Sequence, residues 1–170
     1  MIIERFLTPP QRLIHLPMPD CDALTEVDAL QEAEIIDARF SLDDGSLGLL
    51  LDLRVALQIM TGNVAVLVLW GVSEAHFQHV QPAWPHHGHV VMSSKPSAAD
   101  GLLTLEIGCL DGWRMRASAE AADFLVGDIP GLPEVPPDRN EASAEEITAG
   151  TPRWASEFVP EWGTFIQPKS

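Results

Sequence analysis

Two alternating segments that flank Asp44-Gly45 constrain the fold more than any other feature of this sequence. Leucine recurs at every second position through residues 47–53, and apolar and polar residues also alternate through residues 36–42. An Asp-Gly pair between alternating segments is typical of a β-hairpin with a two-residue turn. In that register Phe40 faces Leu49, and the apolar side chains of residues 36–42 point into the core. The sequence therefore predicts an antiparallel β protein.

Further short apolar segments extend this pattern to seven or eight strands. Residues 64–70 are apolar throughout, as in a central strand covered on both faces, and Gly71 marks a bulge or bend. Asp111-Gly112 marks a second hairpin, which needs an irregularity because a two-residue turn would put its apolar faces out of phase. The polar residues 93–101 predict a loop, and residues 122–126 predict a last core strand. The resulting antiparallel meander forms a barrel or a sandwich, and the sequence leaves this choice open.

The 170 residues fit one domain, which we divide into three parts. Residues 1–31 form an N-terminal arm broken by prolines, in which residues 22–30 are expected to make two helical turns. Residues 32–127 form the antiparallel β core. Residues 128–170 form a Pro-rich C-terminal extension. Short helices are thus expected only at the periphery of the β core.

The C-terminal extension combines a helix signal with an unusual number of aromatic residues. Ser143 and Glu146 are spaced as a capping box, which predicts a short helix after Ser143. The aromatic residues are Trp154, Phe158, Trp162 and Phe165. We expect these side chains to dock on the β core, and the alternative is an exposed patch that binds a partner.

The charge of the chain is strongly negative, with 25 Asp and Glu against 10 Lys and Arg, a net of −15. Such a surface repels nucleic acid and anionic membranes, and it attracts a basic protein. Plain solubility is the alternative explanation. No apolar segment approaches the roughly 18 residues that a membrane span requires, and no secretory leader is recognisable, so we expect a cytoplasmic protein.

Five of the six histidines fall within one segment, which raises the question of a metal site. They are His76, His79, His86, His87 and His89. His76 and His79 are an odd number apart and would point to opposite faces of a strand. His87 and His89 could share a face, and they are weak metal candidates. We predict no cofactor, and a pH-sensing role also stays open.

The outward face of the first hairpin carries four charged candidate binding residues. With the two-residue turn, Asp37 lies opposite Asp52, and Arg39 and Arg54 lie diagonal to them. Such a group is typical of a cross-strand ion ladder, and the alternative is contact with a polar ligand or partner. We add the tryptophans of the extension as candidate binding residues, namely Trp154 and Trp162.

No catalytic residue is predicted. Phosphate-binding, nucleophile-elbow, zinc-protease and dinucleotide-binding motifs are missing from the sequence. Cys109 lies within an apolar alternation and is expected to be a small buried hydrophobe.

Three segments resemble small acidic proteins of high-GC bacteria. The segments are Gly48-Leu49-Leu50-Leu51-Asp52-Leu53-Arg54, Thr61-Gly62-Asn63-Val64-Ala65-Val66-Leu67-Val68 and Phe124-Leu125-Val126-Gly127-Asp128-Ile129-Pro130-Gly131-Leu132-Pro133. The resemblance implies a bacterial cytosolic origin and assigns no catalytic residue. In size and charge, some such proteins are similar to immunity proteins of toxin systems.

The leading hypothesis is a non-enzymatic, immunity-like or antitoxin-like module that masks a basic protein. The second is a β barrel that binds a small molecule in an apolar cavity lined by Trp70, Trp84 and Trp113. The third is a metal-dependent enzyme built on residues 76–89. A homodimer that covers an open sheet edge is also compatible with the sequence.

Overall fold

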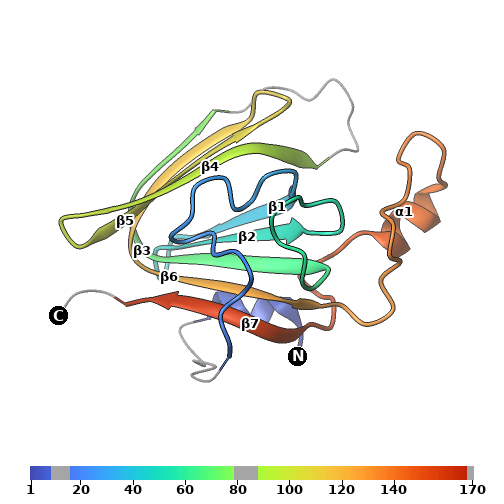
Figure 1. Cartoon of the computed structure of the whole chain (residues 1–170), viewed down its shortest axis with the longest axis horizontal. Helices are drawn as coiled ribbons and strands as arrows, with labels where there is room; N and C mark the ends of the chain where they lie inside the picture. The colour runs from blue at the N-terminus through green and yellow to red at the C-terminus, as the bar shows by residue number, and fades with distance from the viewer. Residues whose placement is uncertain (9–15, 79–87, 168–170) are drawn as a thin grey trace.

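A computed structural model describes residues 1–8, 16–78 and 88–167, and these form one antiparallel sheet of seven strands (Figure 1). The predicted mainly β, antiparallel fold with peripheral helices is confirmed. The strands are β1 (Glu34–Ser41), β2 (Ser46–Asp52), β3 (Val64–Gln78), β4 (His89–Ala99), β5 (Leu102–Cys109), β6 (Arg114–Asp128) and β7 (Val159–Ile166). The helices are a 3-10 helix, η1 (Ile3–Leu7), and α1 (Ala144–Gly150).

The strand order joins two meanders, β1-β2-β3 and β4-β5-β6-β7, into one sheet. β3 pairs with β6 from Val64↔Gly127 to Gln78↔Arg114, which is the full length of β3. β1 pairs with β4 at only two positions, Glu34↔Val90 and Ile35↔His89. Each of the six strands β1 to β6 is therefore paired on both sides, so that the pairing closes on itself. The β3–β6 pairing is long and the β1–β4 pairing is short.

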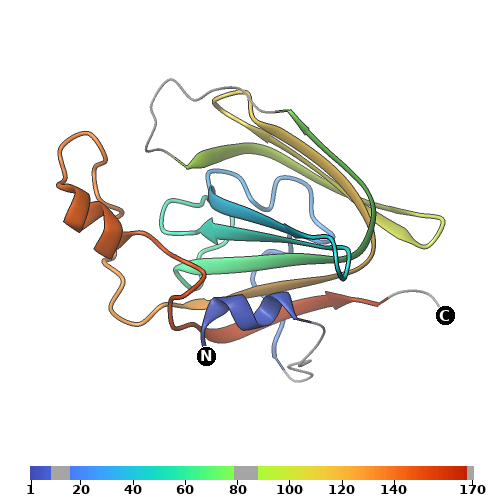
Figure 2. The same ribbon diagram turned by 180° about the vertical axis from the view of Figure 1, so that it is seen from behind.

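β3 and β6 are each longer than the strands predicted over residues 64–70 and 122–126, because each continues without a break into a neighbouring strand segment. Gly71 adopts a left-handed conformation (φ +60°), and the register between β3 and β6 shifts between Val72 and Glu74. The bend expected at Gly71 is confirmed. Figure 2 shows both strands curving together, so that their far ends rise toward β4 and β5. This bend folds one half of the sheet over the other.

Two hydrophobic cores result, one on each face of the sheet. The inner core lies between the two halves and includes Leu49, Leu67 and Phe124, and residues from 23–33 and 53–59 complete it. The outer core covers the back of β2, β3 and β6 and includes residues of η1 and Trp154–Phe158 (Figure 2). Gly48 permits this cover, because a Cβ there would collide with the side chain of Leu7.

The register predicted for the first hairpin is wrong, although the hairpin itself exists. Ser41 pairs with Ser46, which leaves a four-residue loop instead of a two-residue turn. The Asp44 carboxylate accepts hydrogen bonds from the backbone N–H and the hydroxyl of Ser46, and these bonds favour the longer loop. Phe40 consequently faces Leu47.

Two pairings of charged residues change with this register. Asp37 lies opposite Leu50, and Asp52 lies opposite Glu34, so the predicted Asp37–Asp52 pair does not form. A further register shift between Ile35 and Asp37 contributes to this difference.

The end of β1 is also more exposed than its alternation suggested. Phe40 is 48% exposed and Leu42, in the loop, is 86% exposed. Phe40 borders an open hollow together with Val72 and Phe77, because β4 pairs with only the first residues of β1. The alternation of apolar residues therefore predicted the strand correctly, but it wrongly placed Phe40 and Leu42 in the core.

Three other local expectations need correction or refinement. Residues 93–101 are mostly strand, since β4 continues to Ala99, and Pro96 leaves its ladder with β5 intact. Residues 22–30 form turns instead of helix, with the Asp22 carboxylate binding the backbone N–H of Leu24. The second hairpin avoids the two-residue turn as expected, and Gly112 (φ +88°) helps to bring Ile107 opposite Met115.

The C-terminal extension is attached to the β core by a strand, β7, that the sequence pattern did not predict. β7 pairs with the second half of β6, from Ala122↔Ile166 to Asp128↔Val159. The predicted capping box is present, with reciprocal bonds between Ser143 and Glu146 at the start of α1. Trp154 and Phe158 are buried, as docking of the extension predicts.

Replacement of Gly127 by Ala tests the attachment of β7. A Cβ at this position would collide with the backbone carbonyl oxygen of Val159, which cannot rotate away. We expect Gly127→Ala to lower the free energy of unfolding by about 1–3 kcal/mol in urea denaturation. Gly108→Ala is the matched control, because its methyl group meets only the rotatable hydroxyl of Ser93, at 3.0 Å. Equal stability of the two variants would contradict this packing.

Candidate functional site

Asp52 and Arg54, predicted as surface binding residues, form a buried ion pair. Their side chains are 1% and 3% exposed, and Arg54 Nε donates to Asp52 Oδ1 at 2.9 Å. The guanidinium also donates to the carbonyl oxygens of Pro133 (2.8 Å) and Gly150 (2.7 Å). This pair therefore anchors the C-terminal extension to β2 and is not available to a ligand.

A second buried ion pair, Glu34–Arg139, joins two segments that are far apart in the sequence. Arg139 Nη2 lies 2.9 Å from Glu34 Oε1, and the side chains are only 14% and 11% exposed. The same carboxylate oxygen accepts a hydrogen bond from the backbone N–H of Gly88 at 2.7 Å. No local pattern in the sequence indicates this pair, because its partners are 105 residues apart.

Asp37, Arg39 and Trp154 do come together, on the outer side of β1. Trp154 Nε1 donates to Asp37 Oδ2 at 2.8 Å, and the Arg39 guanidinium carbon lies 5.1 Å from the centre of the indole. Arg39 also forms a 2.7 Å ion pair with Glu4. Because Trp154 is only 3% exposed, its ring docks the extension, while its neighbours shape the surface around it.

A hollow of about 560 Å³ lies between β1 and the end of α1, and we name it the Trp154 groove. Ile36, Leu50 and Ile147 give it an apolar lining. Its arginines are Arg39, Arg139 and Arg153. Of the three, Arg153 is exposed and has no carboxylate within 4 Å among the described residues. The groove can therefore accept an apolar side chain that is flanked by polar groups.

Trp162 lies elsewhere. It sits on β7 opposite Val126 and packs, half-buried, against the inner core. The structure thus brings together Asp37, Arg39 and Trp154 and separates them from Asp52, Arg54 and Trp162.

The histidines that the structure describes are engaged with protein groups. His89 Nδ1 lies 2.6 Å from Asp111 Oδ2, and its ring stacks on Trp113 with 5.1 Å between centroids. His76 Nε2 lies 2.7 Å from Glu74 Oε1. Within residues 1–8, 16–78 and 88–167, no group of three His, Cys, Asp or Glu side chains is arranged to hold a metal. The candidate His87, with His79 and His86, lies outside the described residues.

Negative charge is concentrated in two segments, residues 20–34 and 128–146, which we call the acidic segments. The first carries six carboxylates without Lys or Arg, and the second carries six carboxylates and Arg139. The Glu34–Arg139 pair links the two segments directly. Twelve of the 25 Asp and Glu residues of the chain therefore belong to two connected segments, and all of these except the buried Asp22 and Glu34 lie at least partly on the surface.

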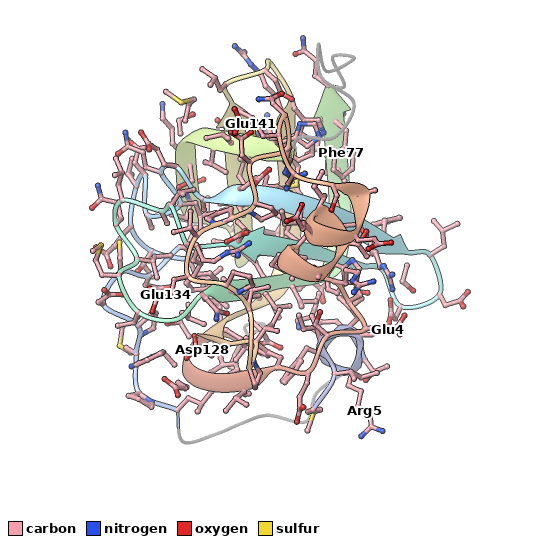
Figure 3. All side chains as sticks on the ribbon, turned by 90° about the vertical axis from the view of Figure 1, so that its right-hand side faces the viewer. Glu4, Arg5, Phe77, Asp128, Glu134 and Glu141 are labelled. Carbon is pink, nitrogen blue, oxygen red and sulfur yellow. The ribbon has the colours of Figure 1, made fainter. Side chains whose placement is uncertain are left out.

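Many of these carboxylates have structural roles in loops and caps. Asp20 accepts bonds from Met60 and Thr61, and Asp28 accepts one from the backbone N–H of Ser94. Exposed carboxylates of the second segment that lack a hydrogen bond or ion pair within the described residues are Glu134, Glu141 and Glu145. Figure 3 looks onto this end of the molecule, where Glu134 and Glu141 are labelled.

Both cysteines are poor nucleophiles in the folded chain. Burial is the main cause, and together with the negative charge of Glu26 it raises the pKa of the Cys21 thiol to about 11. Burial, with the charge of Asp111, raises the pKa of Cys109 to about 12. Cys109 packs in the inner core, as expected for a small hydrophobe.

The tryptophans proposed to line a cavity have different environments. Trp113 is buried in the inner core, whereas Trp70 packs on the outer core and donates a 2.9 Å hydrogen bond to Asp123. Trp84 lies outside the described residues.

Among the described residues, no helix has the length and apolar character that a membrane crossing requires. No protein-family model, curated protein or solved structure matches the chain.

Removal of the Arg54 guanidinium tests the anchor of the extension. Arg54→Met would leave the buried Asp52 carboxylate without its partner, so we expect a loss of about 3–5 kcal/mol in the free energy of unfolding. The double variant Asp52→Asn/Arg54→Met should recover part of this loss, since it leaves no unpaired buried charge. Urea denaturation measures both, and a loss below about 1 kcal/mol for Arg54→Met would contradict the proposed anchor.

The Asp111 carboxylate predicts a pH dependence of stability. Burial opposes its ionisation, but hydrogen bonds from His89 and from the Trp113 backbone N–H outweigh burial and lower its pKa. A lowered pKa in the folded state contributes stability above the unfolded pKa, and this contribution is lost as pH falls below about 4. We therefore expect Asp111→Asn to destabilise at pH 7 and to match the parent near pH 2.

The control for this prediction is Asp43→Asn, since Asp43 is exposed and has no hydrogen bond or ion pair among the described residues. Its stability should follow that of the parent at every pH. Thermal denaturation between pH 2 and pH 7 measures the difference. A deficit of Asp111→Asn that does not change with pH would show that lost packing, not ionisation, explains it.

Proposed function

We propose that this chain is a non-enzymatic binding module whose acidic segments engage a basic protein partner. One observation carries the proposal: the exposed negative charge of these segments is not offset by exposed positive charge. Arg139, the one cation within the acidic segments, is used internally by Glu34, and the neighbouring Arg54 is used by Asp52. The exposed charge within the acidic segments is therefore negative throughout, and the exposed Arg153 lies outside them, in the adjoining Trp154 groove.

Three carboxylates give this surface its capacity to bind. Glu134, Glu141 and Glu145 are exposed and are not required for a cap, a turn or an ion pair in the described structure. Their charges add to a net of −15, which accelerates the approach of a positively charged protein. Such steering raises association rates more than it raises affinity, so a contact that desolvates apolar groups is also needed.

The Trp154 groove supplies that contact. Ile147 and Thr148 belong both to α1 and to the lining of the groove, so the groove adjoins the second acidic segment. A partner side chain that enters the groove would contact the half-buried Ile36 and Ile147, while its basic neighbours contact the carboxylates. Buried apolar anchors surrounded by polar contacts are where protein interfaces gain most of their binding free energy.

The filled interior supports surface recognition over the enclosed-ligand alternative. Phe124, Leu67 and Leu49 are fully buried and occupy the space between the two halves of the sheet. The resemblance to immunity proteins suggests the same class of protein, namely one that masks a basic partner in the bacterial cytosol.

Neutralisation of the three free carboxylates tests the proposal. Immobilised wild-type chain would first capture a basic protein from a lysate of a high-GC bacterium, and the captured protein would be identified and purified. We expect Glu134→Gln/Glu141→Gln/Glu145→Gln to slow its association about tenfold at low salt, as measured by surface plasmon resonance. The fold should be unaffected, because none of the three side chains has a structural partner within the described residues.

The matched control removes three charges elsewhere on the chain. Asp43→Asn/Asp100→Asn/Glu161→Gln changes exposed carboxylates outside the acidic segments, and Asn tolerates the left-handed backbone of Asp100. This variant has the same net charge as the test variant, so it should associate nearly as fast as the wild type. Equal slowing of both variants, or recovery of no basic protein, would overturn the proposal.

A further inference from the structure

Positive charge is gathered on a different face of this acidic chain. Lys95, Arg114 and Arg116 project from the outer side of β4 and β6, in the half of the sheet that the bend at Gly71 folds over. The described residues include eight Lys and Arg in total. Three of these eight share this surface, and another three line the Trp154 groove.

Strand pairing places these residues in two adjacent rows. In one row, Lys95 pairs with Glu106, Glu106 with Arg116, and Arg116 with His76. The next row runs through Ser93, Gly108, Arg114 and Gln78 in the same manner. Arg114 and Arg116 are two residues apart on β6, so their side chains emerge on the same face about 7 Å apart.

An open hollow of about 610 Å³ lies over these rows. Gly108 has no side chain and Ser93 has a small one, so the second row leaves an open space above these two residues. The longer side chains of Lys95, Arg114 and Arg116 surround this space. The ordinary backbone of Gly108 does not require glycine, since its φ is not in the left-handed region. The volume is in the range of small-molecule sites.

Hydrogen-bond donors in the hollow outnumber acceptors. Arg116 is 3.4 Å from Glu106, and His76 is 2.7 Å from Glu74, so each carboxylate on this face already has a partner. Arg114 and Lys95 have no carboxylate within 4 Å among the described residues. A cross-strand ion ladder accounts for Arg116 and places Lys95 opposite Glu106 beyond ion-pair distance, whereas Arg114 has no carboxylate in its row.

We propose that this hollow binds a small oligoanion, an organic molecule that carries phosphate or carboxylate groups. The guanidinium of Arg114 and the ammonium of Lys95 bind its oxygens, with Arg116 and the Ser93 hydroxyl beside them. Charge-assisted hydrogen bonds of this kind are about twice as strong as neutral ones, and arginine matches both groups in geometry. No residue of the acidic segments lines the hollow, so this site is independent of the proposed partner surface.

The experiment follows the arginine Nε–H signals of the full chain by NMR during titration with inorganic phosphate and, separately, with citrate. We expect the signals of Arg114 and Arg116 to shift and saturate, while the signal of Arg5 does not move. Saturation by phosphate alone assigns phosphate chemistry to the site, and saturation by citrate alone assigns carboxylate chemistry. Both results support the proposal.

Two variants separate a specific site from general attraction of anions. Arg114→Gln should weaken binding at least tenfold, and Arg5→Gln should leave it unchanged, because Arg5 is an exposed cation outside the hollow. Shifts that rise linearly without saturation, or equally at Arg5 and Arg114, would overturn the proposal. It would also be overturned by concentration-dependent sedimentation that Arg114→Gln abolishes, since the acidic segments of a second copy would then occupy the face.

Discussion

The hydrogen-bonded pairing of β3 with β6 is the interaction on which the rest of the structure depends. These strands pair from Val64↔Gly127 to Gln78↔Arg114 and belong to both halves of the sheet. β2 borders the first half of β3, while β5 and β7 border successive halves of β6. On the opposite side, β1 and β4 share only two residue pairs. The bend at Gly71, within this long β3–β6 pairing, therefore determines how the two halves of the sheet enclose the inner core.

Buried ion pairs extend this scaffold to the acidic segments. Arg54 holds Asp52 and two backbone carbonyl groups of the extension, and Arg139 holds Glu34 at the start of β1. A chain with few cations thus uses two of them inside, where they fix the extension to the sheet. Within the acidic segments no exposed cation compensates the exposed carboxylates, whereas Arg39 and Arg153 line the adjoining Trp154 groove and three further cations, Lys95, Arg114 and Arg116, lie on another face. The proposed partner and the proposed anion would therefore bind different faces by opposite charge.

Local patterns in the sequence located several elements, missed β7 and predicted contacts poorly, for a physical reason. Alternation around Asp44-Gly45 located the hairpin, and the spacing of Ser143 and Glu146 located a helix start, because both signals depend on neighbouring residues. The hairpin register depended on the bonds between Asp44 and Ser46, so the predicted Asp37–Asp52 group was wrong. The burial of Trp154 was expected, but its partner Asp37 is 117 residues away, and no local signal connects them. The two rows that contain Lys95, Arg114 and Arg116 depend on the register of four strands at once.

The central claim is that buried ion pairs hold the C-terminal extension as a fixed acidic surface, and backbone ¹⁵N relaxation tests it most directly. If the claim is right, the order parameters of residues 128–150 resemble those of β3 and β6, at about 0.85. They should fall when Arg54→Met removes the anchor. Values below about 0.6 in the wild-type chain would contradict the claim, because a segment that moves freely on this timescale is not held by Arg54 and Arg139.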